Sequence, residues 1–446
     1  GEKNSRRSYS DQEISEQSPH PGSFASLEMR KLYGYPEVLV EDAIVGASDK
    51  LPKRKVVFLI AYLGQNYCGF QINEAQRTVQ AEIEYALYKS KFLDLQNFGF
   101  PTKYSWATSA RTDKNVHACA QVCNAKIRYS ASLAQVRETI NSNLPSDICI
   151  LDVVQTSKNF NAKTARNKVK YQYMLPSFVL QDSVTLKDFF LLHTSSATTI
   201  TNDKPLPELT SEEASNLYSM FKSYRATSDQ IHRLNDALKQ FEGTHSFHNY
   251  TRGRDYDDKS TSRFIMTFVV GDPIISEQDG MEWIPTHVTG QSFLLNQIRK
   301  MISMAIDVAR GSISITSSSD DDKPSYDFMM ESFSKNKMQI DIAPAQGLFL
   351  EMSYFDYYNQ RSGTGKSSIL DWSSSSATAD SEAVARWKHF KEHLIMPHIM
   401  KEEGVDYNFI NYMYVHEFKH TYYNTKRSFG QQQEDNDEEG RGATND

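Results

Sequence analysis

Cysteine is scarce in this chain, and no run of apolar residues is long enough to cross a membrane. The 446 residues include four cysteines, Cys68, Cys119, Cys123 and Cys149, and no secretory signal precedes them. So few cysteines favour a reduced, intracellular compartment. No stretch of about 18 consecutive apolar residues occurs, so the sequence predicts that nothing spans a membrane.

Motifs for metals and cofactors are equally scarce. Cys119 and Cys123 have C-x3-C spacing, but no second pair with ligand spacing accompanies them, which favours two buried thiols over a zinc site. GTGKSS, from Gly363, resembles the end of a phosphate-binding loop, yet Gln360 stands where that loop needs its first glycine. HFKEH, from His389, has the spacing of an inverted zinc-protease motif without a third ligand nearby. The sequence therefore predicts no metal and no cofactor.

Negative charge is concentrated at the end of the chain. The net charge is −7, and the last sixteen residues hold six acidic residues and one arginine, a local net charge of −5. The remaining 430 residues therefore carry −7 minus −5, or −2, and 48 of the 49 lysines and arginines. Such a distribution is compatible with a basic, nucleic-acid-binding cleft. The basic PKRK at 52–55 fits either a nuclear signal or the edge of a strand.

Hydrophobic residues make up 39% of the chain, enough for sizeable cores, and their spacing predicts alternating strands and helices. The predicted strands are 55–64, 120–129, 168–178, 262–270, 281–290 and 347–358. The predicted helices are 78–90, capped by Thr78, then 228–241, 293–310 and 382–403. This order predicts an α+β fold of two similar halves with mainly antiparallel sheets and helices on the outer faces.

Composition changes along the chain set the predicted domain boundaries. Two α+β halves, 51–180 and 228–360, make up most of the chain, and a C-terminal helical extension follows them. The other predicted segments are a disordered N-terminal arm (1–50), an irregular insertion (181–227), a low-complexity insertion (361–381), the helical extension (382–425) and an acidic disordered tail (426–446).

The loop before the strand at 120–129 combines residue types that suit a reaction centre. It runs through Arg111, Thr112 and Asp113, then Asn115 and His117. A neighbouring arginine can keep a carboxylate ionised or contact phosphate, and asparagine tolerates the positive φ of a sharp turn. Taken alone, these residues favour a structural turn with an ion pair over a catalytic loop.

Eight ordered segments resemble the TruA family of tRNA pseudouridine synthases. RTDKNVHA resembles the family motif R-T-D-x-G-V-H-A, with Asn115 in place of glycine. The other similar segments are YLGQNYCGFQ, TVQAEIEYAL, NSNLPSDICI, FNAKTARNKVKYQYML, FEGTHSFHNYT, and GQSFLLNQIRKMISMAIDVARG with APAQGLFLEMSYFDY. Together they cover roughly residues 55–178 and 230–356, and the long insertions and C-terminal helix resemble the eukaryotic nuclear branch.

The resemblance implies roles for four residues. Asp113 is the expected catalytic nucleophile, acting on C6 or C1′ of the uridine or assisting an elimination. Arg299 is expected to pair with Asp113, against the simpler reading of a solvent-facing helical arginine. Tyr171 is expected to lie against the uracil, and Arg111 to help extrude the base; without the resemblance, Tyr171 reads as a core aromatic.

Further expectations concern partners and location. The implied fold has a central cleft between the halves, lined with basic residues that contact tRNA, with messenger or small nuclear RNA as further candidates. The basic helix around RWKHFKEH fits either an extension of that surface or an ordinary packed helix. We expect no cofactor, no membrane partner, a monomer, and a nuclear location with a mitochondrial pool as a second possibility.

Two other functions compete with catalysis. A catalytically weak RNA-binding or tRNA-folding factor on the same scaffold is suggested by Asn115, where the family has glycine. A small-molecule anion binder at the Arg111 loop would leave Tyr171 and Arg299 unexplained.

Overall fold

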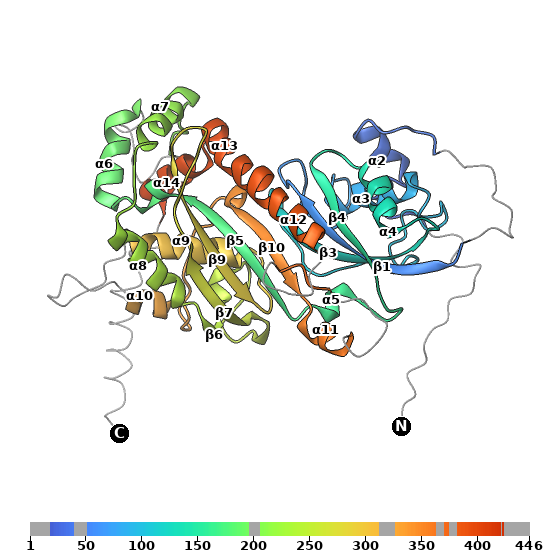
Figure 1. Ribbon diagram of the computed structural model, residues 1–446. Helices are drawn as coiled ribbons and strands as arrows, with labels where there is room; N and C mark the ends of the chain where they lie inside the picture. Colours follow the sequence, from blue (N-terminus) through green and yellow to red (C-terminus); the bar gives the residue numbers. More distant parts are fainter. Residues whose placement is uncertain are drawn as a thin grey trace, which may run out of the picture. The chain divides into compact units, whose positions relative to one another are not determined.

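We describe the fold from a computed structural model of the chain (Figure 1). The structure describes residues 18–39, 51–195, 206–311, 326–362, 370–373, 381–420 and 422. These residues form two compact units. The first unit runs to Asn167 and includes Leu350–Ile395; the second comprises Lys168–Phe349 and the residues from Met396 onward. Helices and mostly antiparallel strands make up both units, in agreement with the predicted α+β class.

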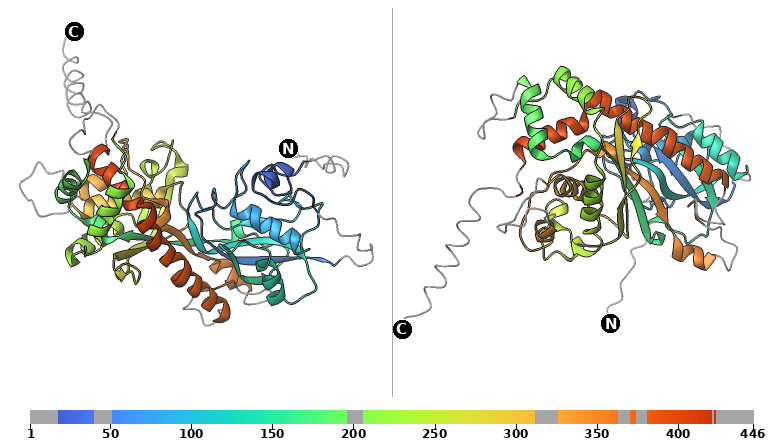
Figure 2. Two further views of the ribbon diagram at one scale, coloured as in Figure 1. Left: turned by 90° about the horizontal axis from the view of Figure 1, so that it is seen from above. Right: turned by 60° about the vertical axis from the view of Figure 1, so that its left-hand side comes forward.

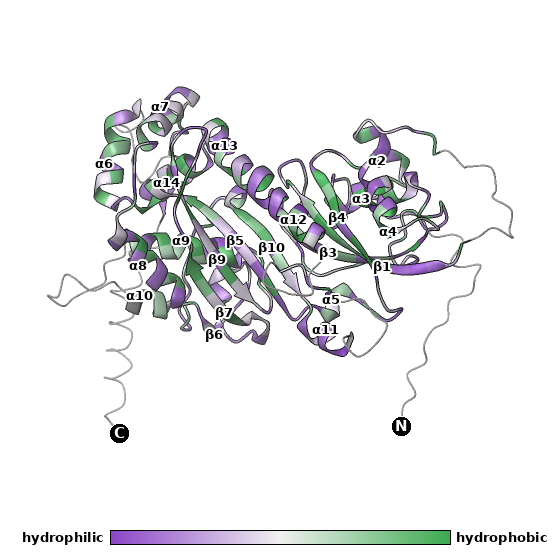
Figure 3. Cartoon of the chain, in the orientation of Figure 1, coloured by the Kyte–Doolittle hydropathy of each residue, from purple (hydrophilic) through white to green (hydrophobic). Residues whose placement is uncertain are grey.

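The first unit is built around strand β1 (Lys53–Tyr62). Strands β3 (His117–Arg128) and β4 (Ile148–Gln155) flank it, both antiparallel, and the short β2 (Ala107–Thr108) pairs with β3. The stretch from Val56 to Tyr62 is buried, as the nearly continuous apolar run predicted. Figure 3 shows the hydrophilic start of β1, where most of the PKRK sequence lies, so this basic cluster forms part of a strand.

Helices α3 (Val79–Lys89) and α4 (Leu133–Asn141) lie side by side in the first unit (Figure 2). As predicted, Thr78 caps α3, because its side chain accepts a hydrogen bond from the backbone N–H of Ala81. Strand β10 lies beside β3. The remaining elements are α5 (Ala162–Ala165), β10 (Leu348–Tyr354, from Leu350 in this unit), α11 (Asp356–Ser362), α12 (Ser381–His389) and a π-helical turn, η6 (Phe390–Ile395).

Residues 18–39 correct the prediction that the whole arm through residue 50 is disordered. They include helix α2 (Leu27–Leu32) and the fully buried Phe24, whose ring contacts those of Tyr35 and Tyr85. A helix of six residues is too short to give a readable hydrophobic period, so aromatic burial holds the segment without a periodic signal. The other residues of the predicted arm up to residue 50 lie outside the described part.

The second unit contains a separate run of antiparallel strands. Strand β9 (Glu282–Gly290) lies between β5 (Lys168–Pro176) and β7 (Ser262–Val270), and β7 also pairs with β6 (Gly243–Ser246). The short β8 (Ile274–Ile275) pairs with the start of β9. Because β5 pairs with β9, it belongs to this unit, so the unit boundary at Asn167 differs from the predicted boundary at residue 180.

Two predicted amphipathic helices pack together in the second unit. Helices α8 (Ser228–Lys239) and α9 (Gln297–Ala309) are neighbours, and α8 also contacts β7 (Figure 1). Ile302, Ala305 and Ile306 of α9 are buried, as predicted, but so are all the other residues from Met301 to Ala309, so burial is not confined to the apolar side of this helix. The unit also contains α10 (Tyr326–Glu331) and the short 3-10 turns η1 (Ser177–Leu180), η3 (His248–Tyr250), η4 (Lys259–Thr261) and η5 (Ala345–Gly347).

The predicted irregular insertion at 181–227 contains two helices, which is a second correction. They are α6 (Ser183–His193) and α7 (Ser211–Phe221), and both contact α14 (Asn408–Lys419), the helix that follows α13 (Met396–Asp406) (Figure 2). Their apolar faces are covered by a helix some 200 positions away, which a local reading of Ser- and Thr-rich sequence misses.

Other predicted segments fall largely outside the described residues, including most of 361–381 with GTGKSS, and the acidic tail 426–446. Trp387 of α12 is buried and donates to the carbonyl of Glu351 at 3.1 Å, so the packed-helix interpretation holds there. No helix in the described ranges combines the length and hydrophobicity needed to cross a bilayer.

Candidate active site

Asp113 lies in the loop that joins β2 to β3. The carbonyl of Asp113 accepts the N–H of Val116 at 3.2 Å, which closes a four-residue turn. Asn115, the third residue of this turn, has a φ of 65°, the left-handed region that this turn position requires and that asparagine tolerates. Asp113 is partly buried and Arg111 is exposed. The turn needs the positive φ that glycine has in the family motif, and Asn115 supplies it.

Short, uncharged hydrogen bonds hold the loop on the sheet. The carbonyl of Ala110 accepts hydrogen bonds from Thr108 Oγ1 at 2.9 Å and from Gln121 Nε2 at 2.7 Å. Two residues further along the chain, the buried Thr112 Oγ1 lies 2.6 Å from the hydroxyl of Tyr62, at the end of β1. Strands on both sides therefore fix the backbone immediately before Asp113.

Two glycines after β1 allow the backbone to approach the loop. A Cβ at Gly64 would lie 2.2 Å from the carbonyl oxygen of Val116. A Cβ at Gly69, where φ is +86°, would lie 2.9 Å from the carbonyl oxygen of Thr112, the same oxygen that accepts the N–H of Phe70 at 3.2 Å. The YLGQNYCGFQ segment thus fits against the Asp113 loop only without side chains at these two positions.

Asp147, from the NSNLPSDICI segment, fixes the chain between those glycines. Its carboxylate accepts hydrogen bonds from Asn66 Nδ2 at 2.9 Å and from the Tyr67 hydroxyl at 2.5 Å, and its carbonyl accepts the N–H of Leu63 at 2.9 Å. Burial, with the hydrogen bond to Asp147, raises the pKa of Tyr67 well above its ordinary value, so this hydroxyl remains a donor. The Asp113 loop therefore meets the YLGQNYCGFQ segment, which the NSNLPSDICI segment in turn holds through Asp147.

In the second unit, Tyr171 lies on β5 opposite Val288 of β9 and is 7% exposed. Its ring meets that of Phe293 edge to face, with 5.5 Å between centroids. Two residues along the strand and on the same face, Tyr173 donates its hydroxyl to the carbonyl of Pro344 at 2.8 Å. Phe293 therefore fixes the orientation of the Tyr171 ring.

Arg299 lies in the first turn of α9, which begins after Asn296 in a left-handed conformation with φ 61°. Its Nε donates to the carbonyl of Ala343 at 2.5 Å, and its Nη1 donates to Asn296 Oδ1 at 3.3 Å. The carbonyl of Arg299 accepts the N–H of Ala343 at 3.4 Å. Arg299 is therefore a partly buried and positioned guanidinium rather than the solvent-facing arginine of the alternative reading.

The four predicted site residues form two pairs. Arg111 and Asp113 share one loop of the first unit, whereas Tyr171 and Arg299 belong to the second unit.

The cysteine pair and a group of histidines around Asp341 consist of residue types that can bind metals. The buried Cys119 donates its thiol to the carbonyl of Glu351 at 3.3 Å, and burial raises the pKa of both Cys119 and Cys123, the environment expected of two buried thiols. Ligand atoms of Asp341, His416 and His420 lie within 4.8 Å of one another. His416, however, turns both ring nitrogens towards carboxylates, and these raise its pKa to about 10, so it is an imidazolium without a lone pair for a metal.

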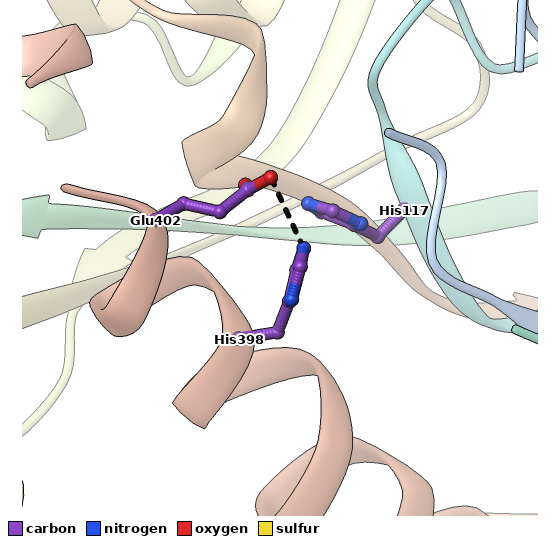
Figure 4. A group of neighbouring side chains, drawn as sticks. All are labelled: His117, His398 and Glu402. Carbon is purple, nitrogen blue, oxygen red and sulfur yellow. Dashed lines mark ion pairs between the residues drawn. The ribbon is translucent and has the colours of Figure 1, made fainter. Parts of the chain in front are cut away.

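A second histidine–carboxylate pair lies on α13. His398 Nε2 is 3.2 Å from Glu402 Oε1, one helical turn away (Figure 4). Burial lowers the pKa of His398 and raises that of Glu402 to about 7, with the nearby Asp406 adding to the rise. Burial therefore disfavours the charged form of both residues, which weakens this contact as an ion pair near neutral pH.

No sequence pattern predicted the residues that hold the site residues in place. Tyr62 and Gln121 looked like ordinary strand residues, and His416 lies in the C-terminal extension without a recognisable motif. The position of Tyr62 within the resembling YLGQNYCGFQ segment was the one available signal for its role. For His416 no local signal existed, because its partners are more than 70 residues away.

Comparison with known proteins places this geometry in a family. A family model described as tRNA pseudouridine synthase matches residues 237–356. The chain is 31% identical over 367 residues to tRNA pseudouridine synthase 1 of Eremothecium gossypii, an alignment that covers 72% of this chain and 67% of that protein. The chain belongs to the tRNA pseudouridine synthase family, of the TruA type, and the resemblance seen in the sequence is confirmed.

Two further relatives carry related names. The tRNA pseudouridine synthase 1 of Kluyveromyces lactis is 30% identical over 355 residues, covering 70% of this chain and 62% of that protein. The mouse protein named pseudouridylate synthase 1 homolog is 29% identical over 379 residues, covering 83% of this chain and 76% of that protein. The chain thus spans about three fifths of the Kluyveromyces relative.

Proposed function

We propose that this chain isomerises uridine to pseudouridine, chiefly in tRNA. In this reaction the N1–C1′ bond breaks, the uracil turns over, and a C5–C1′ bond forms. C5 loses a proton to water and N1 gains one, so nothing is oxidised or reduced and no cofactor is required. The observation that carries the proposal is the Asp113 loop, in a chain of this family. The family-like segment YLGQNYCGFQ packs against the loop, and Asp147 of a second such segment holds that segment in place.

Asp113 is the proposed nucleophile. A carboxylate suits attack on C6 or C1′, or assistance to an elimination, provided that it stays ionised and fixed. Arg299 would supply the opposite charge, through charge-assisted hydrogen bonds from a guanidinium already oriented by Ala343. This pairing requires the two units to close around one cleft, the arrangement implied by the family resemblance.

Arg111 and Tyr171 would handle the extruded base. A uridine inside an RNA helix must leave its stack before its C1′ can react, and a side chain must take the vacated space. Arg111 is exposed beside Asp113 and suits that task. Tyr171, oriented by Phe293, would stack on the uracil and retain it while the glycosidic bond is broken.

The proposal extends to partners and location. Lysines and arginines lining the cleft would bind RNA phosphates, with messenger and small nuclear RNA as secondary substrates of a monomeric enzyme. A nuclear location, with a mitochondrial pool, rests on the resemblance to the eukaryotic branch.

The alternative of a catalytically weak RNA-binding factor depended on Asn115. Since Asn115 adopts the φ of 65° that the turn requires, the substitution gives little reason to doubt the loop. Catalysis is therefore the stronger proposal.

The test is release of tritium from unmodified tRNA labelled at uridine C5, comparing the parent protein with Asp113→Asn and Asp113→Ala. We expect release by the parent and a loss of at least about 1,000-fold in both variants, with tRNA affinity within about threefold of the parent. Release by the variants at the parent rate would remove Asp113 from the mechanism. Tight tRNA binding without release by any of the three proteins would establish the binding-factor alternative.

A further inference from the structure

A buried charged cluster joins the C-terminal helix α14 to two other parts of the second unit. His416, on α14, places its Nε2 2.9 Å from both carboxylate oxygens of Asp307, on α9. Its Nδ1 lies 2.7 Å from Asp341 Oδ2, and His420 Nδ1 lies 3.2 Å from the same oxygen. One imidazolium therefore bridges α9 to the chain segment that contains Asp341.

Helix α14 makes further polar contacts along α9, the helix that carries Arg299. The Tyr412 hydroxyl lies 2.7 Å from Ser303 Oγ, and Glu417 forms a buried ion pair with Arg310. With His416 and Asp307 between them, these contacts follow the two helices over about two turns. Because charge-assisted hydrogen bonds are stronger than neutral ones, the contacts at Asp307 and Arg310 contribute most to holding α9 in its orientation.

The second element that α14 holds is the segment 338–344, which lacks regular secondary structure. Tyr422, just after α14, accepts the N–H of Gln339 at 2.8 Å through its carbonyl, and His416 holds the Asp341 carboxylate. Two residues beyond Asp341, the carbonyl of Ala343 receives the Nε–H of Arg299. A segment without its own hydrogen-bonding ladder needs such external anchors to hold an acceptor in place.

We propose that His416 and Asp341 are positioning residues for Arg299. His416 would fix both the helix from which Arg299 projects and the segment whose carbonyl orients its guanidinium. The C-terminal extension would thereby serve the reaction without touching the RNA at this point. This inference rests on the proposed function, because it assigns Arg299 a role in catalysis.

The groups that face His416 come from three parts of the unit. They are Asp307 on α9, Asp341 on the segment, and Tyr412 and His420, whose rings stack on that of His416. Arg310, just after α9, and the Tyr422 hydroxyl act on Asp307. Two carboxylates therefore share one imidazolium, with Arg310 close to Asp307. A neutral amide at position 416 would remove the positive charge that the two carboxylates share, and would leave Asp341 with His420 and Asp307 with the Tyr422 hydroxyl.

The kinetic test compares His416→Gln and Asp341→Asn with Tyr412→Phe under single-turnover conditions at saturating tRNA. His416→Gln and Asp341→Asn should slow tritium release about tenfold, while the Kd for tRNA changes less than about threefold. Tyr412→Phe is the matched control, because it removes a contact between the same two helices without touching Asp341; it should stay within about twofold of the parent rate. Parent rates in both His416→Gln and Asp341→Asn would overturn the proposal.

A double-mutant cycle tests whether His416 acts through Arg299. Arg299→Lys keeps the charge but loses the fixed fork of donors. If His416 works by positioning Arg299, His416→Gln should slow the Arg299→Lys protein by less than about twofold. A full tenfold loss in that background would mean that His416 acts elsewhere, and the proposal would fail.

Hydrogen exchange separates this proposal from the proposed function, because it needs no activity. In His416→Gln, the peptide covering 338–345, which contains the Ala343 N–H bonded to Arg299, should exchange at least about tenfold faster than in Tyr412→Phe. Equal exchange in the two variants would refute positioning, whatever the activity. If the parent is inactive but the exchange difference is as expected, the proposed reaction would be refuted, whereas the positioning of Arg299 by His416 would be supported.

Discussion

The loop that carries Asp113 and the turn that carries Arg299 are fixed by different kinds of interaction. The direct supports of the Asp113 loop are neutral: backbone hydrogen bonds, hydroxyl and amide side chains, and two glycines that allow close approach. The Asp147 carboxylate acts on the neighbouring segment, through Asn66 and Tyr67. Around Arg299 the supports lead to a buried cluster of charges centred on His416. Neutral supports depend on shape, whereas charged ones depend also on protonation. Steric changes should therefore disturb the first region most, and changes of pH the second.

The largest effect of the steric kind is expected from Gly69→Ala. The new Cβ would lie 2.9 Å from the carbonyl oxygen of Thr112 and would push the backbone next to Asp113. Because a displacement of about 1 Å at a reacting group can cost about 100-fold in rate, we expect a loss of that size in tritium release with tRNA affinity retained.

Gly280→Ala is the matched control for this substitution. Gly280 also has a positive φ, +77°, but its Cβ would meet nothing within 4 Å, so it shares the backbone strain and lacks the clash. A Gly280→Ala protein should lose about 1 kcal/mol of stability and keep its activity. Equal rates for the two variants would mean that the approach of Gly69 to Thr112 does not position Asp113.

Local chemistry explains why six of the strands, the helices α3, α8 and α9 and the Asp113 turn were predictable from sequence, whereas strand β4 was not predicted. The buried run of β1, the Thr78 cap of α3 and the apolar side of α9 each show a period or a cap within a dozen residues. Asn115 likewise reveals its turn through its own tolerance of positive φ. These features depend on neighbours in sequence, so sequence patterns capture them.

Features that depend on distant partners were missed. Phe24 is buried by aromatic residues up to about 60 positions away, and α6 is covered by α14. His416 meets Asp307 across 109 positions, and the residues around it form no recognised motif. The supports of Arg299 are therefore mainly tertiary, whereas the turn of Asp113 is mainly local, and this is why the sequence predicted one of them better.

The charged region should respond to pH, with an intermediate effect on stability. The pKa of His416 is raised to about 10 by Asp307 and Asp341, so its stabilising contribution is complete below its ordinary pKa of about 6.5 and is lost as the pH rises towards 10. The pKa of Asp307 is lowered to about 2 by His416 and Arg310, against the effect of burial, so its contribution is lost as the pH falls from about 4 towards 2. The cluster should stabilise the protein most between about pH 4 and 6.5.

Melting temperatures of the parent and His416→Gln, measured from pH 5 to 9.5, would test this. The difference between the two proteins should be largest near pH 5 to 6 and should shrink at each step above pH 7. Met413→Ala, a buried apolar truncation on the same helix, should instead lower the melting temperature by a similar amount at every pH. A His416→Gln difference that stays constant from pH 6 to 9.5 would contradict a charged His416.

The smallest effect is expected at Asn115, where the neutral region differs from the family pattern. Asn115→Gly removes up to about 1 kcal/mol of left-handed strain, but glycine also gains freedom in the unfolded chain, so the net gain should be below about 1 kcal/mol, or about 2–4 °C in melting temperature. Asn115→Ala keeps the strain and loses the side-chain amide, so it should be less stable than the parent. Tritium release by Asn115→Gly should stay within about twofold of the parent, because the turn already has the conformation that glycine would adopt. A rise of tenfold or more would mean that Asn115 restrains the loop in the parent. The conformation of the Asp113 turn would then limit the rate of the reaction.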